Sequence, residues 1–111
     1  NKKVWGLDYP VEEIGINQLA WHFSIPFWST ENGFYDLTPN EVMHNQKKFK
    51  DEYKRTMKSN LSHPIDIMRN KGKWLILDGL HRLVKAKIIG YKKVKVRKIP
   101  RSPIKNIRRN L

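Results

Sequence analysis

The chain contains no cysteine, which excludes disulfide bonds, thiolate metal sites and a cysteine nucleophile. It also has no apolar run near the roughly 20 residues that a membrane-spanning helix needs, and no N-terminal segment has the pattern of a signal peptide. The histidines have no spacing typical of zinc. These absences predict a soluble, cytoplasmic protein with no membrane partner and no metal site built from protein ligands alone.

Acidic residues are scarce, with 10 Asp and Glu against 23 Lys and Arg in 111 residues. The charge is uneven. Residues 1–41 carry two basic and six acidic side chains, a net charge of −4, whereas residues 42–111 carry 21 basic and four acidic ones, a net charge of +17. Such asymmetry is typical of a surface that attracts a polyanion such as nucleic acid. The alternative is that the surface lysines only keep the protein soluble.

The hydrophobic pattern predicts one α+β domain over residues 1–111, with a small mixed β-sheet and packed helices. The expected order is strand, irregular segment, helix, two strands, helix and strand, at about residues 1–16, 16–37, 38–59, 64–68, 74–77, 81–89 and 94–96. The apolar run at 74–77 is expected to be buried on both faces. Residues 100–111 form a basic tail that we expect to be extended or loosely docked.

The first helix has the clearest start signal. Thr38 can cap it, Pro39 suits its first position, and Glu41 completes a capping box. The second helix has Gly90 where a left-handed residue usually ends a helix.

Residues 16–37 have no clean period and are rich in aromatic side chains. An irregular segment of this length in a small domain is often an insertion or a lid over a binding site. The aromatic side chains could instead belong to the core, or could stack on nucleic acid bases.

The most informative segment is WLILDGLHRLVKA, residues 74–86. It reads as a strand that enters a helix through a glycine turn, a geometry that aims backbone N–H groups at an anion. His81 and Arg82 add donors suited to phosphate, and Gly79 allows a positive φ or close approach of a ligand. We therefore predict that Asp78, Gly79, His81 and Arg82 bind nucleotide phosphates.

Each of these residues also has a purely structural interpretation. Asp78 could cap the helix rather than hold a metal-bound phosphate, and His81 could be a cap or a surface residue. Arg82 could pair with Asp78 or Asp66.

A second basic feature lies on the last strand. Lys93, Lys95 and Arg97 alternate with Val94 and Val96, so one face of the strand could follow a nucleic acid backbone. The alternative is a solvated face that prevents edge-to-edge aggregation.

Residues 63–99 resemble the N-terminal domain shared by ParB partition proteins and sulfiredoxin. The shared pattern comprises a Pro-led strand at 64–65, a buried strand, the loop Asp-Gly-x-His-Arg at 78–82, a helix with Ala86 and Gly90, and a Val-x-Val strand at 94–96. The resemblance implies a ParB/sulfiredoxin-like fold whose loop receives nucleotide phosphates.

The branches of this superfamily imply different chemistry. Sulfiredoxins have a catalytic cysteine where this chain has Leu80, so that redox repair is excluded. ParB proteins bind CTP through Gly-Glu-Arg-Arg, which Gly79 and Arg82 match and Leu80 and His81 do not. The loop is similar to that of free-serine kinases, Asp-Gly-x-His-Arg, which use ATP or ADP. Other members are nucleases.

The resemblance therefore implies a domain that binds ATP or CTP with Mg²⁺. If the protein is an enzyme, it would be an ATP-dependent phosphotransferase with a carboxylate base among Asp8, Glu12 and Glu13, or a nuclease. The alternative is a DNA-binding ParB-like module, non-catalytic or of the nuclease type, that uses its basic C-terminal two-thirds.

Overall fold

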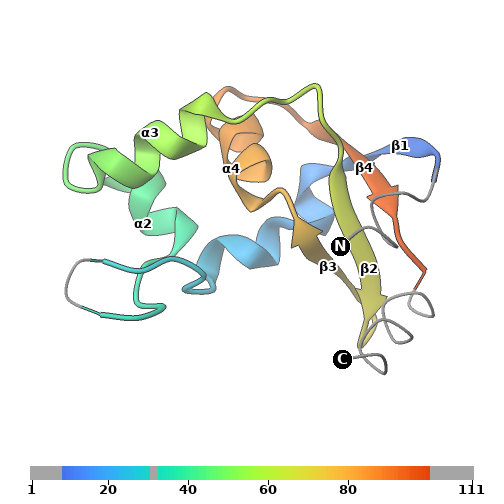
Figure 1. Ribbon diagram of the computed structural model, residues 1–111, viewed down its shortest axis with the longest axis horizontal. Coiled ribbons are helices and arrows are strands. Elements are labelled where there is room, and N and C mark those ends of the chain that lie inside the picture. Colours follow the sequence, from blue (N-terminus) through green and yellow to red (C-terminus); the bar gives the residue numbers. More distant parts are fainter. Residues whose placement is uncertain (1–8, 31–32, 101–111) are drawn as a thin grey trace.

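A computed structural model describes residues 9–30 and 33–100 of the chain. Its strands are β1 (Val11–Gly15), β2 (Ile65–Asn70), β3 (Lys73–Asp78) and β4 (Lys93–Lys98). Its helices are α2 (Pro39–His44), α3 (Lys50–Lys58) and α4 (Leu80–Ile88), with two 3-10 helices, η1 (Ile16–Gln18) and η2 (Ala20–Ser24). The expected α+β class is confirmed (Figure 1).

The four strands form one mixed sheet in the order β1-β4-β2-β3. β1 pairs with β4 and β2 pairs with β3 in antiparallel directions, whereas β2 and β4 are parallel. A parallel pair requires a crossover connection, and here β3 and α4 make it. The helices lie to one side of the sheet (Figure 1).

The core is formed by buried residues of the strands, by the apolar face of α4 and by apolar side chains from residues 16–42. Val94 and Val96 of β4 are buried, as are Leu83 and Val84 of α4. α4 ends as its sequence predicts. Gly90 has φ +91°, its N–H donates to the Lys87 carbonyl, and the Tyr91 N–H donates to the Ala86 carbonyl. These two bonds form a Schellman motif.

The expected single helix over residues 38–59 is wrong, because α2 and α3 are separate helices. Thr38 and Glu41 do form the expected capping box. The helix nevertheless stops at Asn45, which has φ −131° and ψ 59°. Residues 44–48 are all exposed, so no apolar contact holds this stretch against the core in a helical register.

The expectation that the run at 74–77 is buried on both faces is also wrong. β3 is an edge strand, its residues 74–76 are half-buried, and Leu77 is 38% exposed. The fully buried strand segment is residues 65–68 of β2.

The outer edge of β3 is covered by side chains of η2. Trp21 Nε1 donates to the Trp74 carbonyl at 3.2 Å, and the Ile76 N–H donates to His22 Nε2 at 3.1 Å. These bonds satisfy backbone groups that an uncovered edge strand would expose to other chains.

The aromatic segment is partly ordered as 3-10 helix and partly irregular. Phe23 and Trp28 belong to the core, whereas Phe34 is 91% exposed.

Within the described residues the first strand spans only 11–15. Residues 1–8 of the expected strand at 1–16 lie outside the described residues. So do all but the first residue of the basic tail at 100–111. Across residues 9–30 and 33–100, no helix has the length and hydrophobicity to cross a membrane.

Candidate functional site

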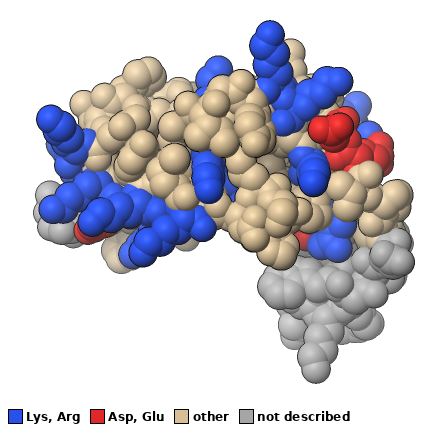
Figure 2. Space-filling view, turned by 90° about the horizontal axis from the view of Figure 1, so that it is seen from above, with Lys and Arg blue, Asp and Glu red and all other residues tan. Residues whose placement is uncertain are grey.

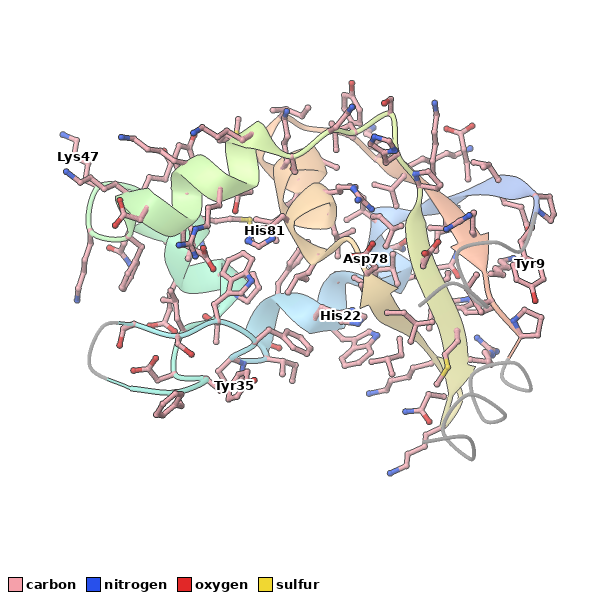
Figure 3. The ribbon with its side chains drawn as sticks, viewed as in Figure 1. Tyr9, His22, Tyr35, Lys47, Asp78 and His81 are labelled. Carbon is pink, nitrogen blue, oxygen red and sulfur yellow. The ribbon has the colours of Figure 1, made fainter. Side chains whose placement is uncertain are left out.

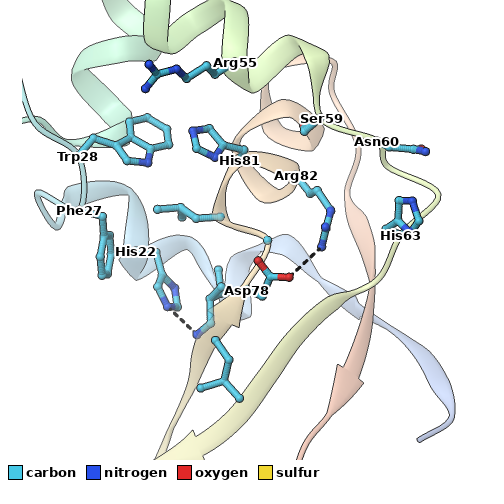
Figure 4. Close-up of a pocket in the computed structure, with 14 residues that line it drawn as sticks. His22, Phe27, Trp28, Arg55, Ser59, Asn60, His63, Asp78, His81 and Arg82 are labelled. Carbon is cyan, nitrogen blue, oxygen red and sulfur yellow. Dashed lines mark hydrogen bonds and ion pairs between the residues drawn. The ribbon is translucent and has the colours of Figure 1, made fainter. Parts of the chain in front are cut away.

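The junction between β3 and α4 lies in a pocket of about 510 Å³. All four residues predicted to bind phosphate line it: Asp78, Gly79, His81 and Arg82. Figure 3 shows Asp78 and His81 near the middle of the molecule, and Figure 4 shows the pocket between α3, η2 and the start of α4. The first turn of α4 therefore faces a cavity.

Gly79 sets the geometry of this turn. Its φ is +111°, a value that residues with a side chain rarely adopt. A Cβ atom here would lie 3.0 Å from an Arg82 guanidinium nitrogen, 3.2 Å from Ile65 Cγ1 and 3.3 Å from Ile65 Cα. The expectation of a positive φ is confirmed, and the close packing gives a second reason for glycine.

Gly79 is the N-cap of α4, and no side chain caps the helix. Asp78 is 54% exposed, with a carboxylate oxygen 4.0 Å from Arg82 Nη1. Asp78 thus does not cap the helix but contacts Arg82 weakly, while the first N–H groups of α4 have no side-chain acceptor among the described residues.

Arg82 is held by the backbone of the loop before β2. Its Nη1 donates to the Pro64 carbonyl at 3.0 Å, and its side chain is 23% exposed. Arg82 lines both the main pocket and a second cavity of about 100 Å³. Part of its anchored guanidinium group therefore remains accessible to an anion in the pocket.

His81 lies between α3 and the aromatic segment. Its ring stacks on Trp28, with a centroid distance of 4.9 Å and an angle of 14°. Its Nε2 atom is buried and has no hydrogen-bond partner among the described residues; Glu52 Oε1 lies 3.7 Å away, too far for a hydrogen bond. The side chain as a whole is 38% exposed. Atoms of the ring other than Nε2 therefore provide its accessible surface.

The pocket also contains residues that the sequence did not indicate. Arg55 and Ser59 come from α3 and its C-terminal end, and His63 comes from the following loop. His22 and Phe27 come from the aromatic segment. No local pattern marks Arg55, Ser59 or His63, because the fold brings them together from separate parts of the chain. His22 and Phe27 belong to the segment that was predicted as an insertion or lid.

His22 is 1% exposed and uses both ring nitrogens. Since the Ile76 N–H can only donate, Nε2 must be unprotonated, and Nδ1 then donates to the Leu19 carbonyl at 2.8 Å. Burial lowers the pKa of His22 below its usual value of 6.5, and the bond to Leu19 opposes this shift. His22 is therefore a neutral structural wall of the pocket.

The basic residues of β4 lie beside the site. Lys93 and Lys95 are exposed and line the second cavity with Arg82 and His63. Arg97 differs, because its guanidinium forms two hydrogen bonds of 2.7 and 2.9 Å with the buried Asp66 carboxylate. Two of the three alternating basic residues, Lys93 and Lys95, are therefore on the surface. The third, Arg97, belongs to a structural ion pair.

Two of the expected carboxylate bases, Glu12 and Glu13, do not line the main pocket. Glu12 pairs with Lys98 at 3.2 Å, Glu13 lines only the second cavity, and Asp8 lies outside the described residues. In the part of the chain that the structure describes, no cluster of three or more potential metal-ligating side chains occurs.

Comparisons with family models, curated proteins and solved structures found no match to this chain.

Proposed function

We propose that the chain is a ParB-like nucleotide-binding domain that holds nucleotide phosphates at residues 78–82. One observation carries the proposal: the uncapped first turn of α4, with Arg82 beside it, faces a pocket of about 510 Å³ that Arg55 and His63 also line. Helix N-termini attract anions, and guanidinium groups form charge-assisted bonds with phosphate.

Each residue of the loop has a separate role in the proposal. Gly79 lets phosphate oxygens approach the backbone, since it carries no side chain at φ +111°. Arg82 donates to the phosphates, and His81 adds a second donor through Nδ1, because its Nε2 atom is buried. Asp78, exposed in the pocket, would contact a Mg²⁺ ion carried by ATP or CTP, because Mg²⁺ in such complexes takes one or two carboxylates with the phosphates.

The local structure around the motif supports the proposal. The loop Asp-Gly-x-His-Arg follows a strand and begins a helix in the structure, which is the context that the resemblance to ParB and sulfiredoxin requires. If phosphoryl transfer takes place, positioning and charge would supply most of the rate.

Isothermal titration calorimetry with ATP and with CTP, each with and without Mg²⁺, tests the proposal. We expect binding by the native chain and a loss of at least tenfold in Arg82→Ala, about 1.4 kcal/mol. Arg69→Ala is the matched control, because Arg69 is exposed and lies over Trp74, away from the pocket. Equal loss in both variants, or no binding by the native chain, would contradict the proposal.

Lys93 and Lys95 support a second candidate function, DNA binding without nucleotide hydrolysis. Both are exposed next to Arg82, and Lys and Arg side chains far outnumber Asp and Glu on the face shown in Figure 2. Binding to duplex DNA should weaken steeply between about 50 and 200 mM salt. A Lys93→Gln/Lys95→Gln variant should reduce that salt dependence.

A further inference from the structure

The pocket has two chemically different sides. Figure 4 shows Phe27, Trp28 and His22 on one side and Arg82, Asn60 and His63 on the other. The polar side adjoins the second cavity, which Lys93 and Lys95 of β4 line together with Arg82 and His63. A ligand that fills the pocket therefore needs an apolar part and an anionic part.

Not every residue of the apolar side has surface left for a ligand. His22 is 1% exposed, and Trp28 is 8% exposed with one ring face on His81. Phe27 is half-buried, with its ring stacked on His22 at 5.7 Å, and Leu77 is 38% exposed. Phe27 and Leu77 thus keep contact surface in the pocket, as do the half-buried Ile76 and Leu80.

An inorganic phosphate or a polyphosphate chain would leave this apolar side unused. Pockets of about 300–1,000 Å³ with apolar walls and few polar groups are typical of small-molecule sites, and the observed volume of about 510 Å³ lies in that range. Planar heterocycles gain free energy by stacking on aromatic side chains.

We propose that Phe27 and Leu77 form a nucleobase subsite, so that the ligand lies with its base against these side chains and its phosphates at residues 79–82. This inference rests on the proposed nucleotide-binding function. It assigns a role to the aromatic segment at 16–37, which lies outside the part of the chain that resembles ParB and sulfiredoxin.

Calorimetry with paired ligands tests the subsite. ATP and CTP carry a base, whereas inorganic tripolyphosphate carries the same phosphate chain without one. We expect the native chain to bind both nucleotides at least tenfold more tightly than tripolyphosphate. Phe27→Leu keeps an apolar side chain but removes the aromatic ring, and we expect it to weaken nucleotide binding about tenfold and to leave tripolyphosphate affinity unchanged.

Phe34→Leu is the matched control, since Phe34 belongs to the same segment, is 91% exposed and does not line the pocket. We expect it to bind like the native chain. If Phe27→Leu fails to fold, Leu77→Gln makes the same measurement from an exposed position, with the same expected loss.

The outcomes separate this inference from the proposed function. Unchanged nucleotide affinity in Phe27→Leu and Leu77→Gln, together with a loss in Arg82→Ala, would overturn the subsite and leave the phosphate site intact. Equal affinity of the native chain for tripolyphosphate and nucleotides would also overturn it. No binding of any of these ligands would overturn both.

Discussion

Gly79 combines two constraints that a side chain would violate, a φ of +111° and contacts of 3.0–3.3 Å at the position of a Cβ atom. Gly79→Ala should therefore lower the free energy of unfolding by more than the roughly 1–3 kcal/mol typical of a strained φ alone. It should also reduce ATP affinity. Gly72→Ala is the control, because Gly72 has φ +79° but nothing within 4 Å of a Cβ.

Urea unfolding and calorimetry on both variants check this expectation. The Gly72 variant should show only the cost of backbone strain and should retain ATP affinity. Equal destabilisation of the two variants, with ATP affinity retained in both, would show that close packing at Gly79 does not matter.

His22 makes stability depend on pH in a direction that its burial sets. Burial lowers its pKa in the folded state, so the unfolded chain binds the proton near pH 6.5 while the folded chain does not. The contribution of His22 is therefore complete above pH 6.5 and is lost as the pH falls toward the folded-state pKa.

We expect the free energy of unfolding to fall between pH 7.5 and 5.5, by up to about 1.4 kcal/mol per pH unit below 6.5. Urea unfolding at several pH values measures it. The dependence should be smaller in His22→Gln and unchanged in His44→Gln, since His44 is exposed on α2. A rise in stability on acidification would contradict the neutral state of His22.

At the level of elements, β2 and β4 are joined by the ion pair of Asp66 and Arg97 as well as by their ladder. The Asp66 side chain is 5% exposed and that of Arg97 is 22% exposed. Removing one member of a buried pair costs about 3–5 kcal/mol, so Asp66→Ala should destabilise the chain by that amount. Glu12→Ala, in the exposed pair with Lys98, should cost at most about 1 kcal/mol.

Thermal and urea unfolding of the two single variants measure the difference. Arg97→Met added to Asp66→Ala should recover part of the loss, because it removes the uncompensated charge. A loss for Asp66→Ala no larger than that for Glu12→Ala would mean that the pair contributes little.

The elements that the sequence predicts well have local signals. The capping box at Thr38 and Glu41 and the Schellman motif at Gly90 depend on neighbouring residues, and both are present. The edge position of β3 depends on where β2 and η2 lie in three dimensions. An apolar run such as residues 74–77 cannot indicate that by itself.

At the scale of the whole molecule, the site combines a local motif with distant segments. Residues 78–82 are contiguous, so a glycine turn before a helix is enough to predict that they lie together. Arg55, His63 and Phe27 reach the pocket from α3, the loop after it and the aromatic segment, and no spacing rule links such positions. Arg97 shows the converse, because its partner Asp66 is on another strand and takes up its charge.

Chemical-shift mapping tests the central claim most directly. In a ¹⁵N-labelled native chain titrated with ATP and Mg²⁺, we expect the largest amide shifts at Gly79, Leu80, His81 and Arg82, with smaller ones at Phe27 and Leu77. In Arg82→Ala, the same shifts should need at least tenfold more ATP to reach saturation. Shifts that concentrate on β4 or on α3 and leave residues 79–82 unchanged, or no shifts at all, would contradict a phosphate site at the start of α4.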